Sequence, residues 1–190
     1  MQSSNVIRSR LRPDGFTLIE LMITIVVIAV IATLAAPSFN QMRERQITRG
    51  AAENVVSQVA NFRMEAVRRN RPVTISSGGS GTGWCVGAAV GATSAACNCE
   101  SADQVCDVGI YPSPGSNDLR GARLVTPFTA FTVDPATGTL DPLGTTARIV
   151  VEAPTDRYGY ELQVDVNPMG RTTICVPSDA TAMPGVQPCA

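Results

Sequence analysis

Residues 16–36 read Phe-Thr-Leu-Ile-Glu-Leu-Met-Ile-Thr-Ile-Val-Val-Ile-Ala-Val-Ile-Ala-Thr-Leu-Ala-Ala, and their one charged side chain is Glu20. At 1.5 Å per residue, a helix of these 21 residues spans roughly 30 Å, the thickness of the hydrocarbon core of a bilayer. Three arginines precede the run, namely Arg8, Arg10 and Arg12. By the positive-inside rule they hold the N-terminus in the cytoplasm, so the stretch predicts a single membrane span with the following chain exported.

Glu20 is the unusual residue of this span. Insertion scales put a carboxylate at the centre of a spanning helix at about 2.5–3.5 kcal/mol, so such an acid needs a partner or a function. The alternative is an acid tolerated near the membrane surface, to which its side chain extends. A cleaved secretory signal has an apolar region of only about 7–15 residues, so the length of this run favours cleavage before it.

Helical periodicity resumes after Pro37, which predicts a helix of about 55 residues in total with an amphipathic second half. Pro37 lacks a backbone N–H, so it either kinks this helix or ends the membrane part. The apolar residues expected to face a core are Ile47, Ala51, Val55, Val59, Phe62 and Ala66. The residues expected to face solvent are Arg45, Arg49, Glu53 and Arg63.

After residue 71 the chain becomes rich in Gly and Pro, and its apolar runs shorten to the length of strands. The predicted strands are 72–76, 83–87, 108–111, 123–125, 130–133, 148–152, 160–166 and 172–176. With no second helical period between them, these strands predict an antiparallel sheet packed on the long helix, an α+β fold. Residues 76–83 are expected to form a flexible loop. Their glycines do not match a phosphate-binding loop, since no Gly-Lys-Ser/Thr follows.

Charge and composition exclude several classes of function. The chain has no histidine, which removes the commonest general base and metal ligand, and we expect no catalytic site and no cofactor. Residues 1–71 hold ten arginines against five acids, whereas residues 72–190 hold five arginines against eleven acids. A globular part with a net charge of −6 is a poor general binder of polyanions.

Six cysteines lie in the acidic part of the chain: Cys85, Cys97, Cys99, Cys106, Cys175 and Cys189. None of them forms a Cys-x-x-Cys pair, which disfavours a metal knuckle or a redox motif, and an exported domain favours disulfides. Six cysteines allow fifteen connectivities. We expect Cys175 to join Cys189 and tie down the C-terminal tail, with two further bridges among the other four.

The run Gly15-Phe16-Thr17-Leu18-Ile19-Glu20-Leu21 resembles the class III signal of type IV pilins and type II secretion pseudopilins. The resemblance implies that a prepilin peptidase removes the basic leader, residues 1–15, by cleavage between Gly15 and Phe16. It also implies N-methylation of the new Phe16 amine. In that family, Glu20 would pair with the terminal amine of a neighbouring subunit during filament assembly, which supplies the partner that its energetics require.

Two further stretches resemble the GspH/FimT group of minor pilins and pseudopilins. One is residues 62–70, Phe-Arg-Met-Glu-Ala-Val-Arg-Arg-Asn, followed by a strand at residues 72–75; the other is Gly-Arg-Thr-Thr-Ile-Cys at residues 170–175. Some members of the group bind DNA through Gly-Arg-x-Arg. Here Thr173 replaces the second arginine, so Arg171 alone is expected to contact DNA weakly.

The resemblance implies four parts: the leader, the membrane and filament-core helix 16–36, the amphipathic helix 37–71 and the periplasmic or extracellular domain 72–190. The first expectation is a minor type IV pilin that primes assembly near the filament tip, in twitching motility or adhesion. The alternatives are a minor pseudopilin of type II secretion, a DNA-binding minor pilin in natural transformation, and a major pilin. The expected partners are other minor pilins and the major pilin, the inner-membrane assembly platform, the prepilin peptidase, and the inner-membrane lipid bilayer before assembly.

Overall fold

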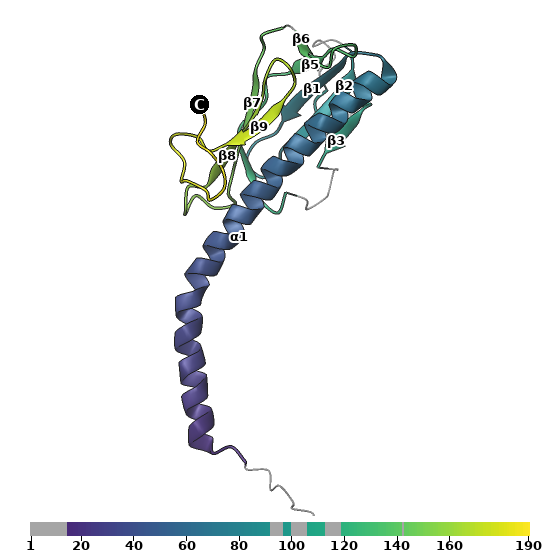
Figure 1. Cartoon of the computed structure of the whole chain (residues 1–190). Helices are drawn as coiled ribbons and strands as arrows, with labels where there is room; N and C mark the ends of the chain where they lie inside the picture. Colours follow the sequence, from purple (N-terminus) through teal and green to yellow (C-terminus); the bar gives the residue numbers. More distant parts are fainter. Residues whose placement is uncertain (1–14, 92–96, 100–105, 113–118, 142) are drawn as a thin grey trace, which may run out of the picture. The chain divides into compact units, whose positions relative to one another are not determined.

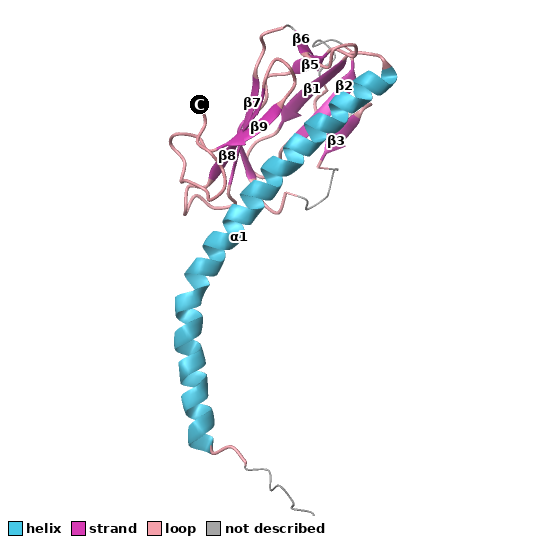
Figure 2. Cartoon of the chain, viewed as in Figure 1, coloured by secondary structure: helices cyan, strands magenta, loops and turns pink. Residues whose placement is uncertain are grey.

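The computed structural model describes residues 15–91, 97–99, 106–112, 119–141 and 143–190. The chain divides after Asn40 into two compact units, and helix α1 (Leu18–Arg69) contributes to both (Figure 1). Figure 2 shows strands and loops, with no further helix, in the described chain after α1. The α+β fold class is therefore confirmed.

In the second unit, α1 buries the predicted apolar face. The six residues at spacings of three or four are each at most 8% exposed: Ile47, Ala51, Val55, Val59, Phe62 and Ala66. The helix ends where Asn70 adopts a left-handed conformation, with φ at 49°, and Pro72 follows two residues later. Asparagine tolerates this conformation and proline does not extend a helix, so the local sequence explains the end of α1.

In the described residues, nine strands form two antiparallel sheets. The first sheet has the order β3-β2-β1-β5-β6, from β1 (Val73–Gly78), β2 (Cys85–Val90), β3 (Gly109–Tyr111), β5 (Phe131–Val133) and β6 (Leu140–Asp141). The second has the order β4-β7-β8-β9, from β4 (Arg123–Thr126), β7 (Ala147–Glu152), β8 (Glu161–Val166) and β9 (Thr172–Cys175). Each of the eight predicted strands overlaps one of these, and only the two-residue β6 was not predicted.

Two details of the predicted sheet were wrong. The strands form two sheets instead of one, because β4 pairs with β7 while β5 returns to pair with β1. The expected loop 76–83 is shorter, since β1 continues through Gly78. Two of its serines have hydrogen-bond partners within the fold: the Ser76 hydroxyl donates to the carbonyl of Cys97 at 2.7 Å, and Ser77 Oγ accepts from the Phe128 N–H at 2.6 Å. Satisfied hydroxyls let a polar sequence remain in a buried strand.

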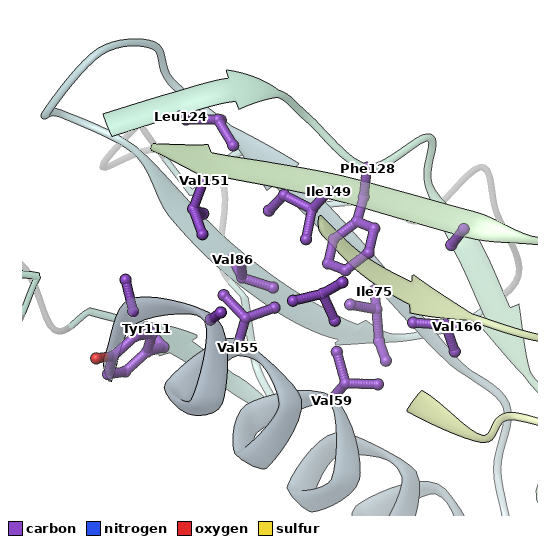
Figure 3. Packing of buried hydrophobic residues seen from close by; sticks show 14 of the residues in the cluster. Val55, Val59, Ile75, Val86, Tyr111, Leu124, Phe128, Ile149, Val151 and Val166 are labelled. Carbon is purple, nitrogen blue, oxygen red and sulfur yellow. The ribbon is translucent and has the colours of Figure 1, made fainter. Parts of the chain in front are cut away.

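A single apolar cluster joins the helix to both sheets. Figure 3 shows Val55 and Val59 of α1 facing Ile75 of β1 and Val86 of β2, with Ile149 of β7 contributed by the second sheet. All five side chains are fully buried. Full burial of an aliphatic side chain is worth about 1.5–3 kcal/mol, so this cluster is the main source of stability in the second unit.

Three disulfides account for all six cysteines: Cys85–Cys99, Cys97–Cys106 and Cys175–Cys189. The last is the pair expected from the sequence, and the other two lie among the remaining four. Gly87 of β2 makes room for the Cys97–Cys106 bridge, because a Cβ at this position would lie 2.7 Å from Sγ of Cys97 and 2.8 Å from Sγ of Cys106. The Cys97–Cys106 bridge therefore packs directly on the backbone of β2.

The substitution Leu162→Ala is expected to destabilise the second unit by about 2–5 kcal/mol, because Leu162 is fully buried and its loss leaves a cavity. The matched control is Leu143→Ala, at a side chain that is 76% exposed, which should change stability by less than about 0.5 kcal/mol. Urea unfolding of the purified full-length chain in detergent measures both values. Equal effects of the two substitutions would contradict the described core.

The substitution Gly87→Ala is expected to destabilise the chain by about 1–3 kcal/mol, because the added methyl group overlaps the Cys97–Cys106 bridge. Gly50→Ala is the control: Gly50 lies inside α1 with no atom near its absent Cβ, so the same change should stabilise the helix by about 0.5–1 kcal/mol. Thermal unfolding and a count of free thiols test the pair. Stabilisation by both substitutions would rule out the described packing of the bridge on β2.

Candidate assembly site

The first half of α1 is an apolar surface that no other described residue covers. The twelve large apolar side chains from Phe16 to Ile31 are between 50% and 81% exposed. A helix that is apolar on all sides is stable only when lipid or other protein surrounds it. No single described helix has the length and hydropathy of a membrane span, while Leu18–Thr33 and Pro37–Arg69 reach them as a bent pair.

Thr17 caps the N-terminus of this helix. Its Oγ accepts a hydrogen bond from the N–H of Glu20 at 3.3 Å, and its carbonyl accepts one from the N–H of Leu21 at 3.2 Å. Thr17 and Glu20 have the spacing of a capping box, in which a hydroxyl and a carboxylate satisfy the free amides of the first turn. Phe16, which is 81% exposed, therefore precedes the capping residue of α1.

Glu20 is exposed in the first turn, where the helix dipole favours a negative charge. Among the residues that the structure describes, no arginine forms an ion pair with it. Its carboxylate therefore remains open to a cation from outside the described chain. Pro37 lies inside α1 and is exposed, and the expected kink at this residue stays a prediction.

Arg63 was expected to face solvent, and this prediction was wrong. Its guanidinium donates hydrogen bonds to the carbonyls of Gly170, Gly138 at 2.9 Å and Met169 at 3.4 Å. It thereby connects α1 to the turn between β8 and β9 and to the turn between β5 and β6. Arg63 adjoins the buried Phe62, and its long side chain extends from the edge of the helix to these carbonyls.

Two properties of Gly170 allow its contact with Arg63. Its φ is +73°, which disfavours other residues, and a Cβ would lie 2.5 Å from Cζ of Arg63. The two stretches that resemble the GspH/FimT group, residues 62–70 and 170–175, therefore contact each other in the fold. We name this contact of Arg63 with Gly170, Gly138 and Met169 the arginine clamp.

The remaining charges of the 62–70 stretch form a local group. Glu65 accepts hydrogen bonds from Arg68 at 2.8 Å and from Arg69 at 2.9 Å. The Arg68 hydrogen bond, followed by that of Arg69, lowers the pKa of Glu65. These arginines also lie in the last turn of α1, where the helix dipole favours a positive charge. The stretch therefore stabilises the end of the helix, and through Arg63 it anchors the helix to turns of both sheets.

Arg171 is exposed beside the clamp. Its backbone N–H donates to Asn167 Oδ1 at 2.9 Å, while its side chain extends from the turn. Two other arginines of the second sheet are paired with acids: Arg123 with Glu152 and Asp156, and Arg148 with Asp165. Because Arg123 and Arg148 are ion-paired, they are less available to a phosphate backbone.

No group of three or more His, Cys, Asp or Glu side chains is arranged to hold a metal ion within the described ranges. The six cysteines are all engaged in disulfides. The features that distinguish this chain are therefore an uncovered apolar helix with one acid, the arginine clamp and a disulfide-stapled domain.

Comparison with known proteins agrees with these features. The model of the family described as type II transport protein GspH matches residues 51–170, and the prokaryotic N-terminal methylation motif matches residues 11–36. No curated protein matches the chain significantly. Among solved structures, the type IV minor pilin FimU of Pseudomonas aeruginosa is similar, with 18% identity and a TM-score of 0.46, over 70% of this chain and 91% of that one. Because the GspH model covers most of the globular domain, the chain belongs to the GspH family of type IV pilin-like proteins.

Proposed function

We propose that the chain is a minor type IV pilin that enters a filament through its first helix, primes assembly and sits at or near the tip. The observation that carries this proposal is the uncovered apolar surface from Phe16 to Ile31, whose single acid, Glu20, has no cation partner among the described residues. The methylation motif at residues 11–36 supports the same role for this segment.

Cleavage between Gly15 and Phe16 would create a new amine next to the capped first turn. On one chain, that amine is held near the positive end of its own helix dipole, which disfavours it there. The Glu20 carboxylate of a neighbouring chain offers a better environment, since in an apolar filament core both charges need a partner. Pairing of the amine with the next Glu20 would set the axial register between subunits. Methylation of the amine keeps its positive charge.

Before assembly, the same segment would anchor the chain in the inner membrane, with the domain from residue 72 in the periplasm. This topology places the prepilin peptidase site and Arg8, Arg10 and Arg12 on the cytoplasmic side. It also places all six cysteines in an oxidising compartment, which fits the three disulfides. The partners would then be the peptidase, the assembly platform, other minor pilins and the major pilin.

A minor pseudopilin of a type II secretion system is the second candidate. The matching family model is described as a type II transport protein, and its match to residues 51–170 supports this role. Both candidates use the same assembly segment, so they differ in the machine that the filament serves. A role in twitching motility or adhesion follows only from the first candidate. DNA uptake ranks third, because Arg171 is an isolated cation on an acidic domain.

The substitution Glu20→Gln is expected to lower incorporation into sheared filaments by at least about tenfold, because it removes the charge that pairs with the neighbouring amine while preserving side-chain size. Membrane insertion and cleavage before Phe16 should be unchanged. Mass spectrometry of the membrane and filament fractions measures the N-terminus, its methylation and the incorporated amount. The control is Glu53→Gln, the same change at an exposed position of α1.

Wild-type incorporation of the Glu20→Gln chain, or a mature N-terminus after residue 36, would contradict the proposed function. Deletion of the gene for this chain distinguishes a role in a pilus from a role in type II secretion. Loss of surface pili with normal export of secreted enzymes supports the minor pilin, and the reverse result supports the pseudopilin.

The substitution Thr173→Arg tests the DNA alternative by rebuilding the missing second arginine on the exposed side of β9. The wild-type chain should bind duplex DNA weakly, and the variant should bind more tightly, with the slope of log K against log salt steeper by about 0.9. A salt titration of DNA binding measures this slope. Tight binding by the wild-type chain that depends on Arg171 would instead favour a role in DNA uptake.

A further inference from the structure

The second unit contains a pocket of about 190 Å³ between the start of its helical segment and the C-terminal tail. The helical wall comes from four residues at positions i, i+3, i+4 and i+7: Met42, Arg45, Gln46 and Arg49. The opposite wall consists of Met183, Pro184 and Val186. Side chains at these helical spacings share one face, so two guanidinium groups and several apolar groups line one hollow.

The tail wall is held by the disulfide that ends the chain. Cys189 is joined to Cys175 of β9, the N–H of Val176 donates to the carbonyl of Gln187, and the N–H of Cys189 donates to the carbonyl of Val176, both at 2.9 Å. A tail of this composition would fray without such links. The Cys175–Cys189 bridge thus has a second role beyond stability, because it builds half of the pocket.

Two arginines and no acid are among the residues that line the pocket. Arg45 packs over the ring of Tyr160 at 4.9 Å, and its buried Nε has no hydrogen-bond acceptor in the described structure. Nε of Arg49 is paired with Glu53 at 2.8 Å. The nearest acid in the sequence, Glu44, is buried and accepts a hydrogen bond from the Thr155 hydroxyl at 2.6 Å. Glu44 does not line the pocket, so its carboxylate does not occupy the space beside the two guanidinium groups.

Guanidinium groups beside apolar side chains suit an anion that carries hydrocarbon, since arginine binds phosphate oxygens in a planar, bidentate manner. The position of the pocket in the chain indicates which anion of this kind is within reach. Met42 follows Ala36, the last residue of the apolar run, by six residues, which span at most about 20 Å even when fully extended. Whatever the orientation of the domain, Met42 lies within this distance of the end of the run.

We propose that this pocket binds the headgroup of an anionic phospholipid at the periplasmic surface of the inner membrane while the chain awaits assembly. The inference rests on the membrane stage of the proposed function. The arginines hold the phosphate, and Met42, Met183, Pro184 and Val186 contact the glycerol and the first acyl carbons. Extraction into a filament would release the lipid and free the pocket. Bound lipid therefore restricts how the domain is presented to the assembly machinery.

Native mass spectrometry of the full mature chain in detergent tests this inference, with phosphatidylglycerol and phosphatidylcholine as the probes. The wild-type chain should prefer phosphatidylglycerol by at least about tenfold. The double variant Arg45→Gln, Arg49→Gln should lose this preference, while the control Arg71→Gln, Arg120→Gln, with the same change of net charge at exposed positions, should keep it. Equal preference in the wild type and the pocket variant would overturn the inference.

Two further experiments test whether the change in lipid preference comes only from altered net charge or from misfolding. The charge-neutral variant Cys175→Ser, Cys189→Ser should also lose the preference, because it frees the tail wall; thermal unfolding of each variant checks that the domain is folded. Inorganic phosphate should fail to displace the lipid, and displacement would assign the pocket to free phosphate instead. No lipid preference, together with loss of crosslinking to a neighbouring subunit in the arginine variant, would assign it to subunit docking.

This result is independent of the filament test. Failure of the proposed function appears as assembly that does not require Glu20. Failure of the present inference appears as lipid binding that does not require Arg45 and Arg49.

Discussion

The structure depends on a change of environment along one helix. From Leu18 to Ile31 every large apolar side chain of α1 is exposed, whereas from Ile47 to Ala66 the apolar side chains are buried on one face. The first half therefore needs an apolar environment from outside the chain, and the second half obtains one from its own sheets. Such a chain is incomplete as an isolated molecule, which is why assembly is the function that its physics favours.

The arginine clamp gives a physical meaning to the stretches that resemble the GspH/FimT group. Arg63 contacts the carbonyl of Gly170, and Gly170 has no Cβ that would displace the guanidinium. Glu65 meanwhile neutralises the two arginines at the end of the helix. In this chain, the Gly-Arg pair thus has a structural role that does not require DNA. Gly170 accepts a hydrogen bond from Arg63 of the helix, and Arg171 is the next residue after this contact.

The helix and the strands were predictable because they depend on local spacing. Val55 and Val59 share a face by periodicity alone. Leu162 and Val164 of β8 lie on the same face of their strand whatever the order of strands in the sheet. The two-sheet arrangement was not predictable, since it depends on which strands pair over long distances. Arg63 was misplaced for a related reason: periodicity assigns a face to its Cα, but a long side chain at the edge of that face reaches partners more than seventy residues away in sequence.

Charge is distributed unevenly between the apolar helix with the residues that follow it and the acidic domain. The arginines of the second sheet are paired with acids, and residues 72–190 as a whole carry eleven acids against five arginines, so the domain surface repels polyanions and favours basic partners. The arginines that follow the apolar run most closely in the sequence are Arg43, Arg45 and Arg49, and the acid among them, Glu44, is buried. Positive charge close to the apolar run and negative charge beyond it would orient the chain on an anionic membrane. The Cys175–Cys189 bridge would contribute to this orientation, because it holds the tail that lines the pocket together with Arg45 and Arg49.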